Sequence, residues 1–126
     1  MKLFTRQFGE IEFSSDKVLK FPDGILGFEE LKDFLLIKED EEFFFWLTSV
    51  DKPEIIFPLI GISLIDSQYP KRRNNESFGI VKLDKEPTKI TVNLKAPVYI
   101  NQNKKSGVQV ILDNDKYSVN YNLFKE

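Results

Sequence analysis

The amino-acid sequence predicts an all-β protein, a small antiparallel barrel-like domain with one or two short helical turns. Apolar and polar residues alternate strictly over residues 89–94, which is the period of a half-buried strand. No long stretch shows the 3.6-residue period of a helix. About nine or ten short apolar segments are separated by turn residues at a spacing of roughly 8–12 residues, as in small barrels and sandwiches. The length of 126 residues predicts a single domain over residues 1–126.

Composition limits the chemistry that this chain can perform. It contains no Cys and no His, so it lacks disulfides, thiolate metal sites and the commonest general base. We therefore expect no enzyme activity, no metal and no cofactor. The net charge of -2 provides no overall field that attracts nucleic acid. The N-terminus has no apolar signal-like core, and no apolar run approaches the length of a membrane span. We therefore expect a cytoplasmic protein that makes no membrane contact.

The first strands are predicted on both sides of Gly9, where residues 3–8 and 10–13 alternate and the glycine indicates a turn or bulge. The chain is organised around the next segment, residues 21–37. Pro22 fixes its own φ, and Gly24 and Gly27 can adopt positive φ, so this segment predicts a rigid corner that ends in a buried strand. We expect the corner to include one short helix-like turn, residues 28–32, and to direct three side chains inward, namely Phe21, Leu26 and Phe28.

The middle of the chain alternates between apolar runs and polar loops. Residues 38–42 form an acidic run that we interpret as a solvated loop, with a partner surface as the alternative. The aromatic run 43–47 predicts a strand whose side chains mostly pack in the core. Residues 55–60 also predict a strand, but Pro58 indicates an edge or a bulge. Residues 68–77 are a polar loop that carries three adjacent cations, Lys71, Arg72 and Arg73.

The second half predicts strands most clearly. Segments 78–83, 89–94, 98–101 and 108–112 are strand-like, and residues 117–121 form a possible last strand. Within the alternating segment we expect Ile90, Val92 and Leu94 to point inward. The polar residues 102–107 contain a glycine and predict a hairpin turn.

Several segments of the chain resemble the signatures of one known family. Residues 21–31 have the pattern F-P-x-G-x-x-G-F-E-E-L, and residues 92–101 have the pattern V-N-L-x-A-P-x-x-I-N. A short basic loop and G-x-Q-V-I-L at residues 107–112 follow the second pattern. Residues 8–11 (F-G-E-I) and 46–51 (W-L-x-S-V-D) also stand in the family's order. Together these segments resemble the FliW family of flagellar assembly factors over most of the chain.

The resemblance implies a FliW-like barrel and a cytoplasmic protein that is not an enzyme. It implies binding and antagonism of the translational repressor CsrA, and binding of flagellin. Flagellin then titrates the protein away from the repressor, which couples flagellin translation to filament assembly. The chain departs from the family pattern at two places. Residues 60–63 replace a V-D-P sequence, and the basic loop 68–77 replaces a longer, acidic and partly helical segment.

We predict the partner-binding surface on the outward face of residues 93–101 and on the hairpin that follows. A rigid strand presents a large amphipathic anchor, amides that give directional hydrogen bonds, and cations from the turn. The predicted partner-binding residues are Asn93, Pro97, Tyr99, Asn101, Lys104, Lys105 and Gln109. Two alternatives stay open: the asparagines bind backbone groups nearby, and Tyr99 is a packing residue. The next candidate surface is the acidic loop 39–42 with residues 43–46.

Other function classes compete with this hypothesis. An OB-like single-stranded nucleic-acid-binding module would use the barrel, the 12 Phe residues and the cations of residues 71–73, although the net charge of -2 opposes it. A carboxylate-pair hydrolase lacks any motif that brings two acids together. An interaction module with another partner is the remaining alternative. We expect no direct nucleic-acid contact and a monomer when the protein is free.

Overall fold

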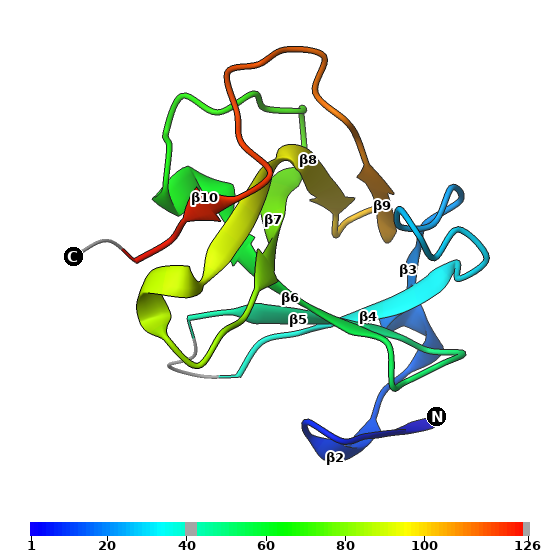
Figure 1. The fold of residues 1–126 in the computed structure, drawn as a ribbon. Coiled ribbons are helices and arrows are strands. Elements are labelled where there is room, and N and C mark those ends of the chain that lie inside the picture. Colours follow the sequence, from blue (N-terminus) through cyan, green and yellow to red (C-terminus); the bar gives the residue numbers. More distant parts are fainter. Residues whose placement is uncertain (40–42, 125–126) are drawn as a thin grey trace.

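The computed structural model describes residues 1–39 and 43–124, which are mostly strands and loops (Figure 1). The chain begins with a separate two-stranded hairpin that pairs β1 (Lys2–Thr5) with β2 (Gly9–Glu12). The turn predicted at Gly9 is confirmed, because this residue has a φ of 69° and starts β2. The hairpin is anchored by Leu3, which is buried, and by Phe8, whose ring packs edge-on against Trp46 at 5.8 Å.

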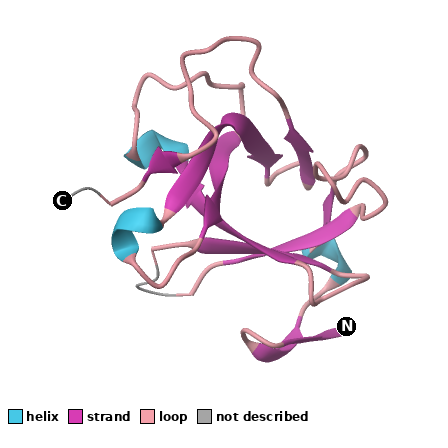
Figure 2. Cartoon of the chain, viewed as in Figure 1, coloured by secondary structure: helices cyan, strands magenta, loops and turns pink. Residues whose placement is uncertain are grey.

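Seven strands close into a barrel, and this confirms the predicted all-β, barrel-like fold (Figure 2). All neighbouring strands in it are antiparallel except β3 and β9, and β9 closes the ring by pairing with β8. A further strand, β10 (Tyr121–Asn122), pairs with the start of β8. Around the ring, the barrel strands are β8 (Thr91–Asn101), β7 (Glu76–Lys82), β6 (Ile56–Gly61), β5 (Phe45–Ser49), β4 (Asp33–Ile37), β3 (Leu19–Lys20) and β9 (Ser106–Gln109).

The strand directions give the barrel two distinct ends. At one, which we call end A, β4, β6 and β8 finish and β3, β5, β7 and β9 begin. End A therefore carries the connections β4–β5, β6–β7 and β8–β9. The opposite end, end B, carries the β3–β4 connection (residues 21–32), the β7–β8 connection and the segment that follows β9. This division decides which side chains can share a surface.

The helical content of the described residues is limited to three single 3-10 turns. These are η1 (Ser15–Lys17), η2 (Ile62–Leu64) and η3 (Pro87–Lys89). The helix-like turn expected at residues 28–32 is a hydrogen-bonded turn instead, in which the Leu31 N–H donates to the Phe28 carbonyl at 3.0 Å. Four or five residues cannot propagate a helix when the next segment is held in a strand.

The barrel interior is a cluster of apolar side chains from every side of the ring. Phe21, Phe34, Leu47 and Val98 are completely buried in it. The Phe21 ring packs edge-on against Phe34 at 5.1 Å and occupies the space next to Gly107, where a Cβ would lie 2.2 Å from the ring. Burial of a large apolar side chain contributes about 1.5–3 kcal/mol, so this cluster is the main source of stability.

A second apolar cluster lies outside the barrel, between the start of β8 and the loops that cover it. It includes Val92 and Leu94, which are buried as the alternation predicts, but in this outer cluster and not in the barrel interior, together with Tyr69 and Tyr117. The two tyrosine rings are 4.6 Å apart, and the Tyr69 hydroxyl donates to the Leu94 carbonyl. Ile90, which we also expected inward, is half-buried against this cluster. The long β6–β7 connection is thereby packed onto β8 instead of being left in solvent.

The corner at residues 21–32 has the rigidity that its sequence predicts. Gly24 and Gly27 have φ values of 67° and 88°, which side chains rarely adopt. The Phe21 N–H donates to the Lys32 carbonyl at 2.7 Å and closes the corner at its base. Phe21 is buried and Phe28 is half-buried, as expected, but the inward position expected for Leu26 is wrong. Leu26 is 52% exposed because it lies between the two glycines, at the outer side of the turn.

The aromatic run and the proline-containing strand both belong to the barrel. Trp46 and Leu47 are buried in β5, whereas Phe43 is 49% exposed before the strand begins. Pro58 lies opposite Trp46 in β6, an interior strand, and not at a sheet edge. The proline is tolerated because pairing with β7 begins only at Leu59, so its missing N–H has no partner to lose there. The acidic residues 40–42 lie outside the described part of the chain.

Candidate partner-binding site

The strand β8 contains four of the seven predicted partner-binding residues, and most of their polar groups bind within the chain. Asn93 is half-buried, and its Oδ1 accepts from the N–H groups of Lys95 and Ala96, both at 3.0 Å. These bonds fix the bend at which β8 loses its pairing with β7. This asparagine therefore binds neighbouring backbone groups, which was the alternative to a partner contact.

Tyr99 lies on the outer face of β8, as predicted, but its expected exposure to solvent is wrong. The side chain is 2% exposed, and its hydroxyl donates to the Pro70 carbonyl at 2.9 Å. Arg72 covers the ring, with its guanidinium carbon 5.5 Å from the ring centroid. Burial raises the pKa of the Tyr99 hydroxyl. Strand alternation did place this residue opposite the core, but the β6–β7 loop covers that outer face, and alternation does not reveal such a cover.

Two further predicted residues on β8 are also buried. Pro97 lies in the covered part of the strand. Asn101 is 8% exposed, and its Oδ1 accepts from the Lys104 N–H at 3.0 Å. This bond is an Asx-type turn that shapes the β8–β9 hairpin. Lys104 is exposed at the turn, and Lys105 is half-buried with its carbonyl accepting from the Lys20 N–H at 2.9 Å.

Gln109 connects the two longest signature segments of the sequence. Its Nε2 donates to the Ala96 carbonyl at 3.1 Å, and its Oε1 accepts from the Leu26 N–H at 2.8 Å. One side-chain amide thus joins the β3–β4 corner to the bend of β8. The bond uses the Leu26 backbone, so the apolar Leu26 side chain remains exposed.

A groove of about 390 Å³ lies at end B beside this amide. Asn93 and Gln109 lie along it, so the structure brings these two predicted residues together and leaves Asn101, Lys104 and Lys105 at end A. The rim contains Leu26 and Val119, which are 52% and 49% exposed. The remaining groove residues come from β6, β7, β8, the β3–β4 connection and the segment after β9. They are Ile25, Phe57, Ile80, Val81, Lys82, Thr91 and Asn120.

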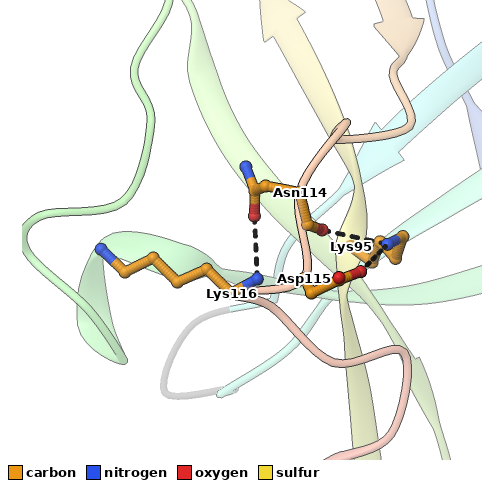
Figure 3. A network of polar contacts seen from close by, with 4 residues as sticks. All are labelled: Lys95, Asn114, Asp115 and Lys116. Carbon is orange, nitrogen blue, oxygen red and sulfur yellow. Dashed lines mark hydrogen bonds and ion pairs between the residues drawn. The ribbon is translucent and has the colours of Figure 1, made fainter.

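The segment that carries Val119 is held over β8 by polar contacts (Figure 3). Lys95 Nζ donates to the Asn114 carbonyl at 3.0 Å and lies 3.8 Å from the Asp115 carboxylate. The Asn114 side chain accepts from the Lys116 N–H at 3.0 Å. Next to this network, the Leu94 N–H donates to the Ser118 carbonyl at 2.9 Å. These contacts fix the position of the groove rim, although the ion pair itself is solvated and contributes little.

The groove has the composition of a protein-binding surface. An apolar floor with a few fixed amides gives affinity and orientation for an apolar side chain of a partner. No group of three or more possible metal-ligating side chains occurs in the described residues. Sequence reasoning missed Leu26 and Val119. The two flanking glycines were a usable signal for Leu26, because the tip of a tight turn points outward, but no sequence signal marks Val119.

No helix in the described parts of the chain is long and apolar enough to cross a membrane.

Comparisons with known proteins agree with the signature segments. The family described as "FliW protein" matches residues 2–123. The flagellar assembly factor FliW of Caldanaerobacter subterraneus subsp. tengcongensis is 37% identical over 142 residues, covering 100% of this chain and 95% of that protein. The protein of the same name from Caldicellulosiruptor saccharolyticus is 38% identical over 135 residues, covering 96% and 89%. A crystal structure of the flagellar assembly factor FliW matches with a TM-score of 0.91 and 31% identity, covering 100% of this chain and 99% of that one. This chain belongs to the FliW family.

Proposed function

We propose that this chain is a cytoplasmic flagellar assembly factor that acts by protein binding and not by catalysis. It binds and antagonises the translational repressor CsrA, and it binds flagellin, so that flagellin translation follows filament assembly. The relatives reported above are named flagellar assembly factors, which supports the assembly role. The two finer activities follow from what the family signatures imply.

One observation carries the choice of binding site. Gln109 and Leu26 come from different signature segments, and a hydrogen bond joins them at the edge of an apolar groove. The signature residues thereby shape a concave surface and leave Leu26 and Val119 exposed at its rim. Exposed apolar side chains around a shaped groove are typical of a partner site, where a few anchors provide most of the affinity.

The seven predicted residues then have different roles in this proposal. Asn93 and Gln109 shape the groove. Pro97, Tyr99 and Asn101 hold β8 and its turn in place from within, and Lys104 and Lys105 lie at end A, away from the groove.

The experiment is titration calorimetry of Leu26→Ala and Val119→Ala against the repressor dimer and against flagellin. Loss of a true anchor costs about 2 kcal/mol or more, so each variant should bind at least one partner about 30-fold more weakly. Leu64→Ala is the matched control, because Leu64 is 70% exposed at end A. Equal thermal midpoints establish that the variants remain folded. Wild-type affinities for both rim variants, or a loss only in Leu64→Ala, would contradict the groove.

A further inference from the structure

The described residues at end A of the barrel carry more positive than negative charge, and the acidic residues 40–42 of the β4–β5 connection lie outside the described part of the chain. The described residues of the connections at end A and of the segment before β3 are 13–18, 38–39, 43–44, 62–75 and 102–105. They include seven Lys or Arg and three Asp or Glu. The cations are Lys17, Lys38, Lys71, Arg72, Arg73, Lys104 and Lys105. Within the described parts of the chain, none of them forms an ion pair. Asp16 attracts Lys17 and Lys105, and the other five cations have no ion-pair partner within those parts of the fold.

The basic loop 70–75 contacts the end of β8, and the β8–β9 turn contacts the start of β7, which directly follows this loop. The Tyr99 hydroxyl holds the Pro70 carbonyl at 2.9 Å, and Arg72 lies over the same ring. In the turn, Gln102 Nε2 donates to Oε1 of Glu76, the first residue of β7, at 2.6 Å. The loop and the turn are thus parts of one surface. We call it the basic rim and define it as Lys71, Arg72, Arg73 and Lys104.

A pocket of about 360 Å³ lies beside the basic rim. Phe45 contributes aromatic surface to it, Phe78 borders it but is only 1% exposed, and Leu64 contributes an apolar side chain that is 70% exposed. Lys71 belongs both to this pocket and to the rim. The site therefore offers cations and an apolar recess at short range, which fits a ligand with carboxylates next to an aliphatic or aromatic side chain.

The aromatic rings at this surface decide between an acidic protein and a nucleic acid. Single-stranded nucleic acids need open aromatic faces on which bases stack. Here Arg72 covers Tyr99, and Lys38 Nζ lies 5.5 Å from the centroid of the Phe45 ring. Glu76 adds a carboxylate to the pocket itself, and the net charge of -2 gives no long-range attraction for a polyanion. The cations favour a short acidic segment of a protein, and the covered rings leave no open face on which nucleic-acid bases could stack.

We propose that the basic rim and the adjoining pocket bind an acidic segment of a partner protein that presents an apolar side chain between its carboxylates. The carboxylates pair with Lys71, Arg73 and Lys104, and the apolar side chain enters the pocket between Phe45 and Leu64. This site lies at the opposite end of the strands from the groove at end B. It is therefore independent of the proposed repressor and flagellin site, and both ends can be occupied together.

Fluorescence anisotropy with a labelled peptide of alternating glutamate and leucine tests this proposal. We expect saturable binding that weakens several-fold between about 50 and 200 mM salt, because the contacts are solvated ion pairs. Lys71→Glu should weaken binding about 10-fold, since it replaces an attraction by a repulsion. Lys85→Glu is the matched control. It makes the same change in net charge on an exposed lysine in the β7–β8 connection, at end B, and should change the affinity less than about two-fold.

Three results would overturn the proposal. The first is equal binding of a peptide in which glutamine replaces every glutamate, because the rim would then contribute nothing. The second is an equal loss in Lys71→Glu and Lys85→Glu, which would mean that only net charge matters. The third is tight binding of single-stranded poly(U) that Lys71→Glu abolishes, which would make the rim a nucleic-acid site. Leu26→Ala at end B should leave peptide binding unchanged, so failure of the groove and failure of the rim are distinguishable.

Discussion

The two corner glycines differ in a way that stability measurements can resolve. Both have positive φ, so a change to alanine costs about 1–2 kcal/mol at either position for the backbone conformation alone. Their surroundings differ sharply. A Cβ at Gly24 would lie 2.6 Å from the Glu29 Cα and 2.8 Å from its carbonyl oxygen, whereas a Cβ at Gly27 meets nothing within 4 Å. Backbone atoms cannot rotate away, so Gly24→Ala must displace the corner.

We expect Gly27→Ala to lose about 1–2 kcal/mol of unfolding free energy and Gly24→Ala about 2–5 kcal/mol, because overpacking adds a further 1–3 kcal/mol. For a chain of this size, that is roughly 3–8 °C and 6–20 °C in thermal midpoint. Urea titration followed by Trp46 fluorescence gives the free energy of unfolding of each variant. If Gly24→Ala is no more destabilised than Gly27→Ala, the argument from the Glu29 contact is wrong. Wild-type stability in both would show that neither glycine is required.

The remaining predictions concern hydrogen bonds around β8. Tyr69→Phe should lose about 1–3 kcal/mol, because it leaves the buried Leu94 carbonyl without its donor. Burial raises the pKa of Tyr69 above that of an unfolded tyrosine. Its contribution is therefore fully present below about pH 10 and is lost as the pH rises further, and absorbance at 295 nm should show this tyrosine ionising only as the protein unfolds. Gln109→Glu keeps the acceptor for Leu26 but loses the donor to Ala96, so it should retain more stability than Gln109→Ala in urea titrations. Asn93→Asp preserves the acceptor for two backbone N–H groups, so a midpoint as low as that of Asn93→Ala would contradict this role.

Local rules were enough to predict the barrel and its corner. The alternation of residues 89–94 correctly predicted that Val92 and Leu94 are buried, and Gly24 and Gly27 do have positive φ. Both features depend on backbone geometry within a few residues, and the local order of residues determines that geometry directly. The predicted exposure of Tyr99 was wrong because it depends on the β6–β7 loop, and the exposure of Val119 depends on the segment after β9. Contacts between segments that far apart leave no periodicity in the sequence.

Local patterns also do not show that the predicted surface of residues 93–101 and the following hairpin is divided between the two ends of the barrel. Strand alternation describes the faces of β8, but the strand spans the barrel, so Asn93 lies at end B and Asn101 at end A. The signature segments meet at end B, through the hydrogen bond of Gln109 to Leu26. Both departures from the family pattern, residues 60–63 and 68–77, lie at end A. The close-packed core lies between the two ends, so the loops of end A can change in length and charge without moving the groove. A groove at end B that the signature segments shape and a basic rim at end A are therefore compatible in one small barrel.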